Sequence, residues 1–105
     1  MLSANQVVYQ AQEGKAKELK EVLNRLVEYS LAVSGCQKFE LYQLNEQRED
    51  FFIIELFKSE KKYTTYLESE TYLSLKSEVD ALVAFNSINP LKLPQCLTKL
   101  GLKKK

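Results

Sequence analysis

The sequence predicts an α+β domain with the ferredoxin-like, split βαβ arrangement, in which an antiparallel four-stranded sheet carries its helices on one face. Three observations support this fold class. Strand-forming runs and amphipathic helical stretches follow one another in the order strand, helix, strand, strand, helix, strand. The two middle strand runs are close enough to form a hairpin. A chain of 105 residues, 45% of them hydrophobic, suits a single core.

The first part of the chain predicts a strand followed by a long helix. Residues 6–12 read QVVYQAQ, and the break Glu13-Gly14 follows them. After this break, apolar residues recur at helical spacing: Ala16, Leu19, Val22, Leu23, Leu26, Val27 and Val33. Because Gly35 can adopt the left-handed conformation that closes a helix, we expect the helix to end near Ser34.

Two strand-like runs, 37–44 and 50–58, predict the hairpin, with a polar connection at 45–49. Side chains of the second run alternate between the two sides of the sheet: Phe51, Ile53, Glu55 and Phe57 on one side, and Phe52, Ile54, Leu56 and Lys58 on the other. Both sides are mostly apolar. One layer of helices covers only one side, so we expect the identical sheet of a second copy on the other, which makes the protein a homodimer. The alternative is that a terminal segment folds over that side.

A helix, a kink and a second helix are predicted after the hairpin. Ser59 before Glu60 and Ser69 before Glu70 are typical N-cap pairs. An apolar stripe then predicts a helix that ends near Ala84: Tyr72, Leu75, Val79, Leu82 and Val83.

The C-terminal segment is predicted to complete the sheet. Pro90 and Pro94 restrict it to a short edge strand or an extended tail. We expect a single domain over residues 1–98 and a basic tail over 99–105. Its lysine run is more typical of a solvated, solubilising end than of a binding site.

Composition argues against several functional classes. The formal charge of +1 comes from mixed signs without a broad basic surface, so we expect no nucleic-acid partner. No apolar run approaches the roughly 20 residues of a membrane span and the start of the chain lacks a signal-peptide pattern, so we expect no membrane partner and a cytoplasmic location. Cys36 and Cys96 lack CxxC spacing and are expected to be reduced thiols.

The chain has no histidine and three glycines. Histidine is the commonest general base at neutral pH and the commonest metal ligand, so its absence argues against a metal site and against Ser-His or Cys-His nucleophiles. The glycines form neither a P-loop nor a GxGxxG motif, so nothing predicts a nucleotide site.

Several features, taken in order, resemble the antibiotic biosynthesis monooxygenase domain, a family of small dimeric α+β barrels. They are Gly14 before the first helix, Gly35-Cys36 at the start of the second strand, Phe39 shortly after it, and the junction ELFKS. In the family this junction commonly reads Glu, any residue, Trp, any residue, Ser, and these places are held here by Glu55, Phe57 and Ser59. The resemblance covers about residues 5–94. It implies a homodimer that binds a small-molecule substrate and needs no cofactor.

The chain departs from the family at two positions where many members have histidine. Tyr66 and, approximately, Thr71 stand there, and neither can replace imidazole at neutral pH. The haem-degrading branch uses an Asn-Trp-His set, which corresponds here to Val7, Tyr66 and about Lys76. We therefore expect no haem chemistry by that route.

Glu55 is the main candidate for chemistry, and two interpretations stay open. Burial would raise its pKa and make it a proton acceptor in a cavity or at the dimer interface. Alternatively, it is a buried structural carboxylate that accepts hydrogen bonds or an ion pair. The resemblance adds Tyr66 as a second catalytic candidate, because the family's polar pocket residue falls there. Expected substrate-binding residues are Asn5, Phe39, Tyr42, Phe57, Tyr63 and Tyr72, although most aromatic residues at helical spacing are core.

The function that the resemblance implies is a cofactor-independent monooxygenase acting on a small phenol or quinol. In such an enzyme a protein base removes the phenolic proton and the substrate anion reduces O₂, which leads to a quinone. The alternative is a non-catalytic dimer of the same fold that binds a small ligand or serves as a scaffold. An isomerase or hydrolase is the third option and lacks an evident acid-base pair.

Overall fold

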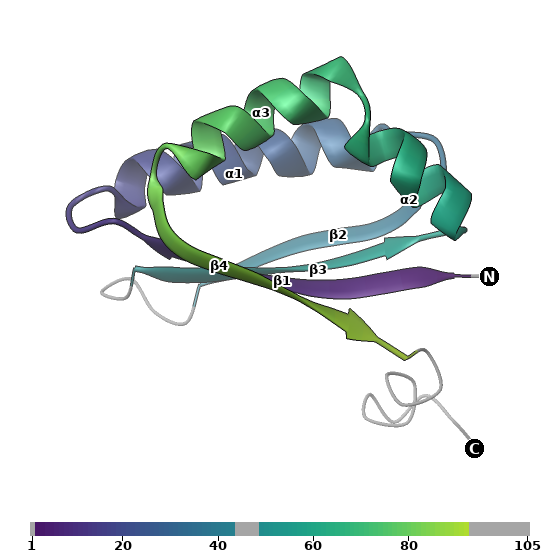
Figure 1. Cartoon of the computed structure of the whole chain (residues 1–105), viewed down its shortest axis with the longest axis horizontal. Coiled ribbons are helices and arrows are strands. Elements are labelled where there is room, and N and C mark those ends of the chain that lie inside the picture. The colour runs from purple at the N-terminus through teal and green to yellow at the C-terminus, as the bar shows by residue number, and fades with distance from the viewer. Residues whose placement is uncertain (1, 44–48, 93–105) are drawn as a thin grey trace.

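The computed structural model describes residues 2–43 and 49–92, which form one sheet with its helices on one face (Figure 1). Its elements are β1 (Ser3–Ala11), α1 (Ala16–Leu31), β2 (Cys36–Gln43), β3 (Asp50–Phe57), α2 (Glu60–Leu67), α3 (Glu70–Asp80) and β4 (Val83–Leu91). The strand order is β2-β3-β1-β4, and all three pairings are antiparallel. The predicted α+β, ferredoxin-like fold is confirmed. Among the residues described, no helix is long and apolar enough to span a membrane.

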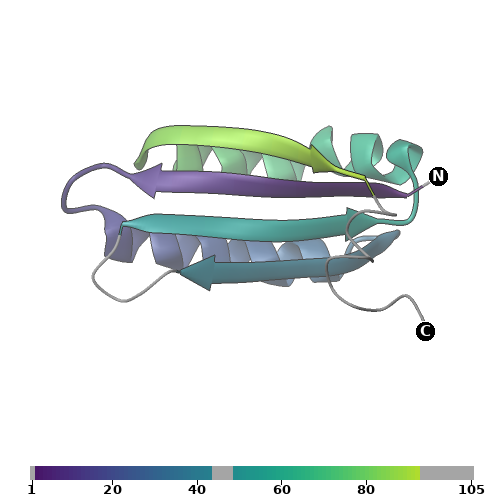
Figure 2. The ribbon, with the colours of Figure 1, turned by 90° about the horizontal axis from the view of Figure 1, so that it is seen from below.

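The core lies between the sheet and the helices. Alternate residues of β1 and β3 point into it, including Val7, Tyr9, Phe51, Ile53 and Phe57. From the helices come Leu19, Val22, Leu23, Leu26, Tyr66, Leu75 and Val79. Figure 2 shows the sheet from the other side, where the strands lie in front of the helices. The helix side of β3 is the one that carries Glu55, so this carboxylate does not lie on the open face of the sheet.

Both predicted N-caps are confirmed. The Ser59 hydroxyl accepts a hydrogen bond from the backbone N–H of Lys62 at 3.1 Å, and the Ser69 hydroxyl accepts one from the N–H of Tyr72 at 3.2 Å. Each cap satisfies a donor that the first turn of a helix would leave unpaired. They fix the starts of α2 and α3.

Two helix ends differ from the prediction. Helix α1 ends at Leu31 rather than near Ser34, because the chain turns before Gly35. Gly35 does have a positive φ of 92°, but it serves the turn into β2, where its carbonyl accepts from Lys58 N–H at 2.7 Å. Helix α3 ends at Asp80 rather than near Ala84.

The C-terminal strand is longer than expected. Val83 pairs with Ala11 in the sheet, so β4 begins there and has nine residues. It lies at the edge, as Pro90 requires. The first strand also begins earlier than predicted, at Ser3 instead of residue 6. Most of the hairpin connection, Pro94, Cys96 and the basic tail at 99–105 lie outside the described residues.

Candidate functional site

Glu55 sits at the centre of a row of residues that crosses the sheet. On β3 it faces Phe39 of β2 on one side and Asn5 of β1 on the other. The Asn5 side-chain amide donates a hydrogen bond to Glu55 Oε1 at 3.4 Å. Both side chains are buried, with exposed fractions of 4% for Glu55 and 6% for Asn5. A carboxylate is thus held inside the core by a neighbouring strand.

The pKa of Glu55 is raised above the ordinary value for glutamate. Burial is the main cause, because it disfavours the charged form, while hydrogen bonding from Tyr63 and Asn5 acts in the opposite direction and only partly offsets it. Within residues 2–43 and 49–92, no lysine or arginine forms an ion pair with Glu55. The carboxyl group is therefore stabilised by neutral donors, and it holds its proton more readily than an exposed glutamate does.

Tyr66 of α2 is the centre of an aromatic cluster beside this carboxylate. Its ring centroid lies 4.7 Å from that of Tyr72 and 4.9 Å from that of Phe57. The rings of Phe39 and Tyr63 are 6.2 and 6.3 Å away. These six side chains, counting Glu55 with the five rings, come from β2, β3, α2 and α3. The structure brings them together on the helix side of the sheet.

The Tyr66 hydroxyl is already paired with the protein. It shares a hydrogen bond of 2.8 Å with the hydroxyl of Ser30 on α1, and both residues are almost fully buried. Burial is also the main reason why the pKa of Tyr66 and Tyr63 is raised far above that of a free phenol, and it raises the pKa of Tyr72 to about 12. These tyrosines stay neutral at physiological pH, so they can donate or accept hydrogen bonds but cannot act as bases.

Tyr42 is separated from the other candidates. It lies opposite Phe52 on the open face of the sheet, and the two rings stack at a centroid distance of 5.1 Å. Its hydroxyl donates to Glu40 at 2.7 Å. Tyr42 follows Phe39 by three positions, and strand alternation places residues at such a spacing on opposite faces. Tyr42, which was predicted to bind substrate, therefore lies on the face of the sheet opposite to that of Glu55 and Tyr66.

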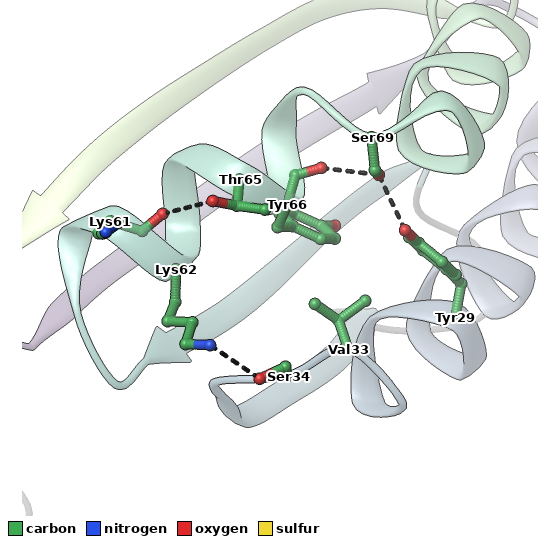
Figure 3. Close-up of a pocket in the computed structure, with 8 residues that line it drawn as sticks. All are labelled: Tyr29, Val33, Ser34, Lys61, Lys62, Thr65, Tyr66 and Ser69. Atoms are coloured by element: carbon green, nitrogen blue, oxygen red, sulfur yellow. Dashed lines mark hydrogen bonds between the residues drawn. The ribbon is translucent and has the colours of Figure 1, made fainter.

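A pocket of about 300 Å³ opens between α2 and the C-terminal end of α1 (Figure 3). Its lining residues are Tyr29, Val33, Ser34, Lys61, Lys62, Thr65, Tyr66 and Ser69. Of the site residues predicted from the sequence, Tyr66 alone lines it. Glu55 does not, so the two catalytic candidates do not share this pocket.

Sequence reasoning missed three residues that shape this region. Ser30 had a signal, because it falls four positions after Leu26 on the buried stripe of α1. Lys62 and Ser34 had none, since their contact joins α2 to the turn after α1. Only the packing of two distant segments brings them together.

The described residues offer no set of acidic or cysteine side chains for a metal ion: no group of three or more lies together. Cys36 is a free thiol whose pKa is raised, mainly by partial burial. What the site can do chemically is therefore limited to one carboxyl group that can exchange a proton, several neutral phenols that can form hydrogen bonds, and an aromatic surface that can hold a ring.

Comparisons with known proteins agree with this fold. The sequence profile of the family described as antibiotic biosynthesis monooxygenase matches residues 3–77. Among solved structures, PA3566 from Pseudomonas aeruginosa is 24% identical with a TM-score of 0.79, and the alignment covers 86% of this chain and 91% of that one. Rv0793 from Mycobacterium tuberculosis is 17% identical, with a TM-score of 0.79 and coverages of 88% and 94%.

A third similar structure is that of SnoaB, a cofactor-independent oxygenase from Streptomyces nogalater. It is 12% identical, with a TM-score of 0.77 and coverages of 87% of this chain and 91% of that one. At such identities the structures show the shared fold alone. A comparison with curated proteins finds no match. Because the family profile matches well over half of the residues of this chain, the chain belongs to the antibiotic biosynthesis monooxygenase family.

Proposed function

We propose that the protein is a cofactor-independent monooxygenase that oxidises a small phenol or quinol between the sheet and the helices. The observation that carries the proposal is the buried Glu55 carboxyl, which has a raised pKa, no ion-pair partner among the described residues, and a surrounding of aromatic side chains. Family membership supports the reaction class, and the structurally similar SnoaB is a cofactor-independent oxygenase.

In the proposed reaction, Glu55 acts as the general base and O₂ is the second substrate. The carboxylate accepts the proton of the substrate hydroxyl, and the electron-rich anion forms a carbon–oxygen bond to O₂ at a ring carbon that bears hydrogen. Glu55 returns its proton to the resulting peroxide. Loss of water then breaks the O–O bond, removes the ring hydrogen and leaves a quinone carbonyl. One oxygen atom enters the product, the other leaves as water, and the substrate supplies the electrons.

The other candidate residues would position the substrate and exclude water. Phe39, Phe57 and Tyr72 offer ring surfaces, and Asn5 orients the carboxylate through its hydrogen bond. Tyr66, a neutral phenol, would hydrogen-bond a substrate oxygen in exchange for Ser30. Tyr63 is half-buried and interacts with Glu55, so we propose that it moves aside when substrate reaches the carboxylate.

We further propose that the protein is a homodimer that joins two open sheet faces. Four apolar side chains of β1 and β3 lie on this face and are only partly buried: Val8, Phe52, Ile54 and Leu56. Tyr42 and Phe85 extend it, with exposed fractions of 43% and 56%. An apolar sheet face of this kind is normally covered by another layer.

The proposed reaction is tested by oxygen consumption with a panel of quinols and hydroxynaphthalenes, started by mixing anaerobic substrate with oxygenated protein. We expect uptake with the wild type and at least about 100-fold slower uptake with Glu55→Gln, since glutamine cannot accept the proton. Glu28→Gln, which removes an exposed carboxylate on α1, is the matched control and should keep the wild-type rate. Uptake that is zero across the panel, or unchanged in Glu55→Gln, would exclude the proposal.

A second candidate function is non-catalytic binding of a small ligand. Two observations favour it: the Tyr66 hydroxyl is paired with Ser30, and Glu55 does not line the pocket at Tyr66. Ligand binding without any oxygen uptake would select this alternative.

A further inference from the structure

The pocket between α1 and α2 has an apolar wall of ring and methyl groups. Tyr66 contributes its ring from α2, Tyr29 comes from the last turns of α1, and Val33 comes from the turn that follows α1 (Figure 3). The rings of Tyr29 and Tyr66 are stacked, with centroids 6.2 Å apart and planes 21° from parallel. A volume of about 300 Å³ is at the lower end of the range for ligand pockets and suits a molecule of one or two rings.

Three hydroxyl groups that line the pocket already donate hydrogen bonds to other groups of the protein. The hydroxyl of Tyr29 donates to Ser69 Oγ at 2.8 Å, that of Ser69 donates to the Tyr66 carbonyl at 2.8 Å, and that of Thr65 donates to the Lys61 carbonyl at 3.0 Å. A hydroxyl has one hydrogen, so none of the three has a donor left for a ligand.

Two side chains that still have a hydrogen to donate meet at one end of the pocket, where Lys62 reaches across from α2 to Ser34 (Figure 3). Lys62 Nζ donates to Ser34 Oγ at 3.0 Å, which uses one of the three ammonium hydrogens and leaves the serine hydrogen available. No carboxylate in the described part of the chain forms an ion pair with Lys62. Lys62 also lies in the first turn of α2, where the helix dipole is positive.

The position of this ammonium group is set by the backbone of the α1–β2 turn. Gly35 has a positive φ of 92°, and the methylene stem of Lys62 packs directly against it. A Cβ atom at position 35 would lie only 2.7 Å from Cβ and Cγ of Lys62. The glycine therefore lets the lysine cross the mouth of the pocket at this place.

We propose that this pocket binds a small aromatic carboxylate, with its ring against Tyr29, Val33 and Tyr66 and its carboxylate on Lys62 and Ser34. The charge of the ligand follows from the Lys62 ammonium, which forms no ion pair among the described residues, and its position follows from the contact between Lys62 and Ser34, which places two donors side by side. The site is separate from Glu55 and does not depend on oxygenation.

The test compares 2-naphthoate with 2-naphthamide, which has the same rings and no charge, in equilibrium titrations of the full chain. We expect naphthoate to bind at least about tenfold more tightly, and its affinity to fall with added salt while that of the amide does not. Lys62→Met keeps the apolar stem and removes the charge, so it should weaken naphthoate at least about tenfold and leave naphthamide unchanged. Lys20→Met, at an exposed position of α1, should change neither.

Three results would overturn the proposal: equal affinities for the acid and the amide, no binding of either at millimolar concentration, or unchanged naphthoate binding by a folded Lys62→Met variant. If that variant does not fold, the salt series and the acid–amide comparison on the wild type decide. If the protein consumes oxygen with quinols but does not bind naphthoate, the carboxylate pocket is excluded and the proposed oxygenase still stands. Naphthoate binding without uptake would support this pocket and exclude the oxygenase.

Discussion

At the scale of single residues, Glu55 lies in an environment that is unusual for a carboxyl group. A carboxylate inside an apolar sheet normally has a cationic partner, whereas Glu55 has an amide and a phenol as its neighbours. Such an arrangement favours the protonated form over the ionised form more than water does. It links the folding of the protein to pH.

The sign of this linkage is that stability falls as pH rises. In the unfolded chain Glu55 ionises near pH 4.3, and in the folded chain its pKa is higher because of burial, so between these values the folded state binds more protons. The free energy of unfolding therefore decreases through this window and stays lowered above it. This decrease in the free energy of unfolding amounts to about 1.4 kcal/mol for each tenfold difference in the ionisation constant of the carboxyl group between the folded and unfolded states.

We expect Glu55→Gln to become more stable relative to the wild type as pH is raised from 4 to 8. Glutamine can still accept the hydrogen bond from Asn5 but does not ionise, so the pH-dependent loss disappears. Urea unfolding at a fixed protein concentration measures the difference, and Glu28→Gln is the exposed control. A stability difference that is the same at every pH would contradict the raised pKa.

Sequence patterns located the key residues but could not assign their partners. The alternation of β3 showed that Glu55 shares a side with Phe51, Ile53 and Phe57, and this is confirmed. It could not show which side the helices cover, because both were apolar. The bond between Tyr66 and Ser30 joins residues 36 positions apart, and no local pattern encodes it.

At the scale of elements, the turn from α1 into β2 is constrained both in its backbone conformation and in its packing against Lys62. Gly35 has a positive φ, and a Cβ atom there would lie only 2.7 Å from the stem of Lys62. Gly14 also has a positive φ, of 79°, but no atom lies within 4 Å of the point where its Cβ would be. Substitutions at the two glycines therefore distinguish the free-energy cost of the backbone conformation from the cost of steric crowding.

Gly35→Ala should destabilise the protein more than Gly14→Ala does. Both variants place a side chain in a left-handed backbone conformation, at about 1–2 kcal/mol. Gly35→Ala must in addition displace the stem of Lys62 or the turn itself, which adds about 1–3 kcal/mol. Chemical denaturation of both variants at one protein concentration measures the difference, and equal losses would show that the turn yields without strain.

Element boundaries illustrate how pairing overrides local pattern. Val83 continues the apolar stripe of α3 at helical spacing, yet it begins β4 because it pairs with Ala11 of β1. The caps at Ser59 and Ser69 were predictable, since a hydroxyl just before the helix bonds to its own first turn. Boundaries set by residues three or four positions apart could thus be predicted from the sequence, whereas boundaries set by pairing with a distant strand could not.

At the scale of the whole molecule, the open sheet face is the surface through which the proposed association would take place. The proposed homodimer covers Phe52, Ile54 and Leu56, which a single chain leaves partly exposed. The fold class followed from the sequence, because it needs only the succession of elements. What covers the open face depends on contacts beyond the described residues of one chain.

We expect sedimentation at micromolar concentration to give twice the mass of one chain, and Ile54→Lys to give the mass of a single chain. A lysine at that position would place an unpaired charge in an apolar interface. Leu73→Lys is the control, because Leu73 is an exposed leucine on α3, with an exposed fraction of 54%, and lies away from the open face. A wild type of single-chain mass would instead indicate that a terminal segment covers the sheet.

Pro90 on β4 has a consequence for the behaviour of the protein in concentrated solution. It stands opposite Asn5 in an outer strand and has no amide hydrogen to offer a newcomer. A strand added along β4 would find one backbone donor missing at this position, which disfavours the growth of an unbroken ladder along this edge. The proposed dimer joins flat sheet faces and makes no use of this outer strand, so the interruption at Pro90 would not weaken it.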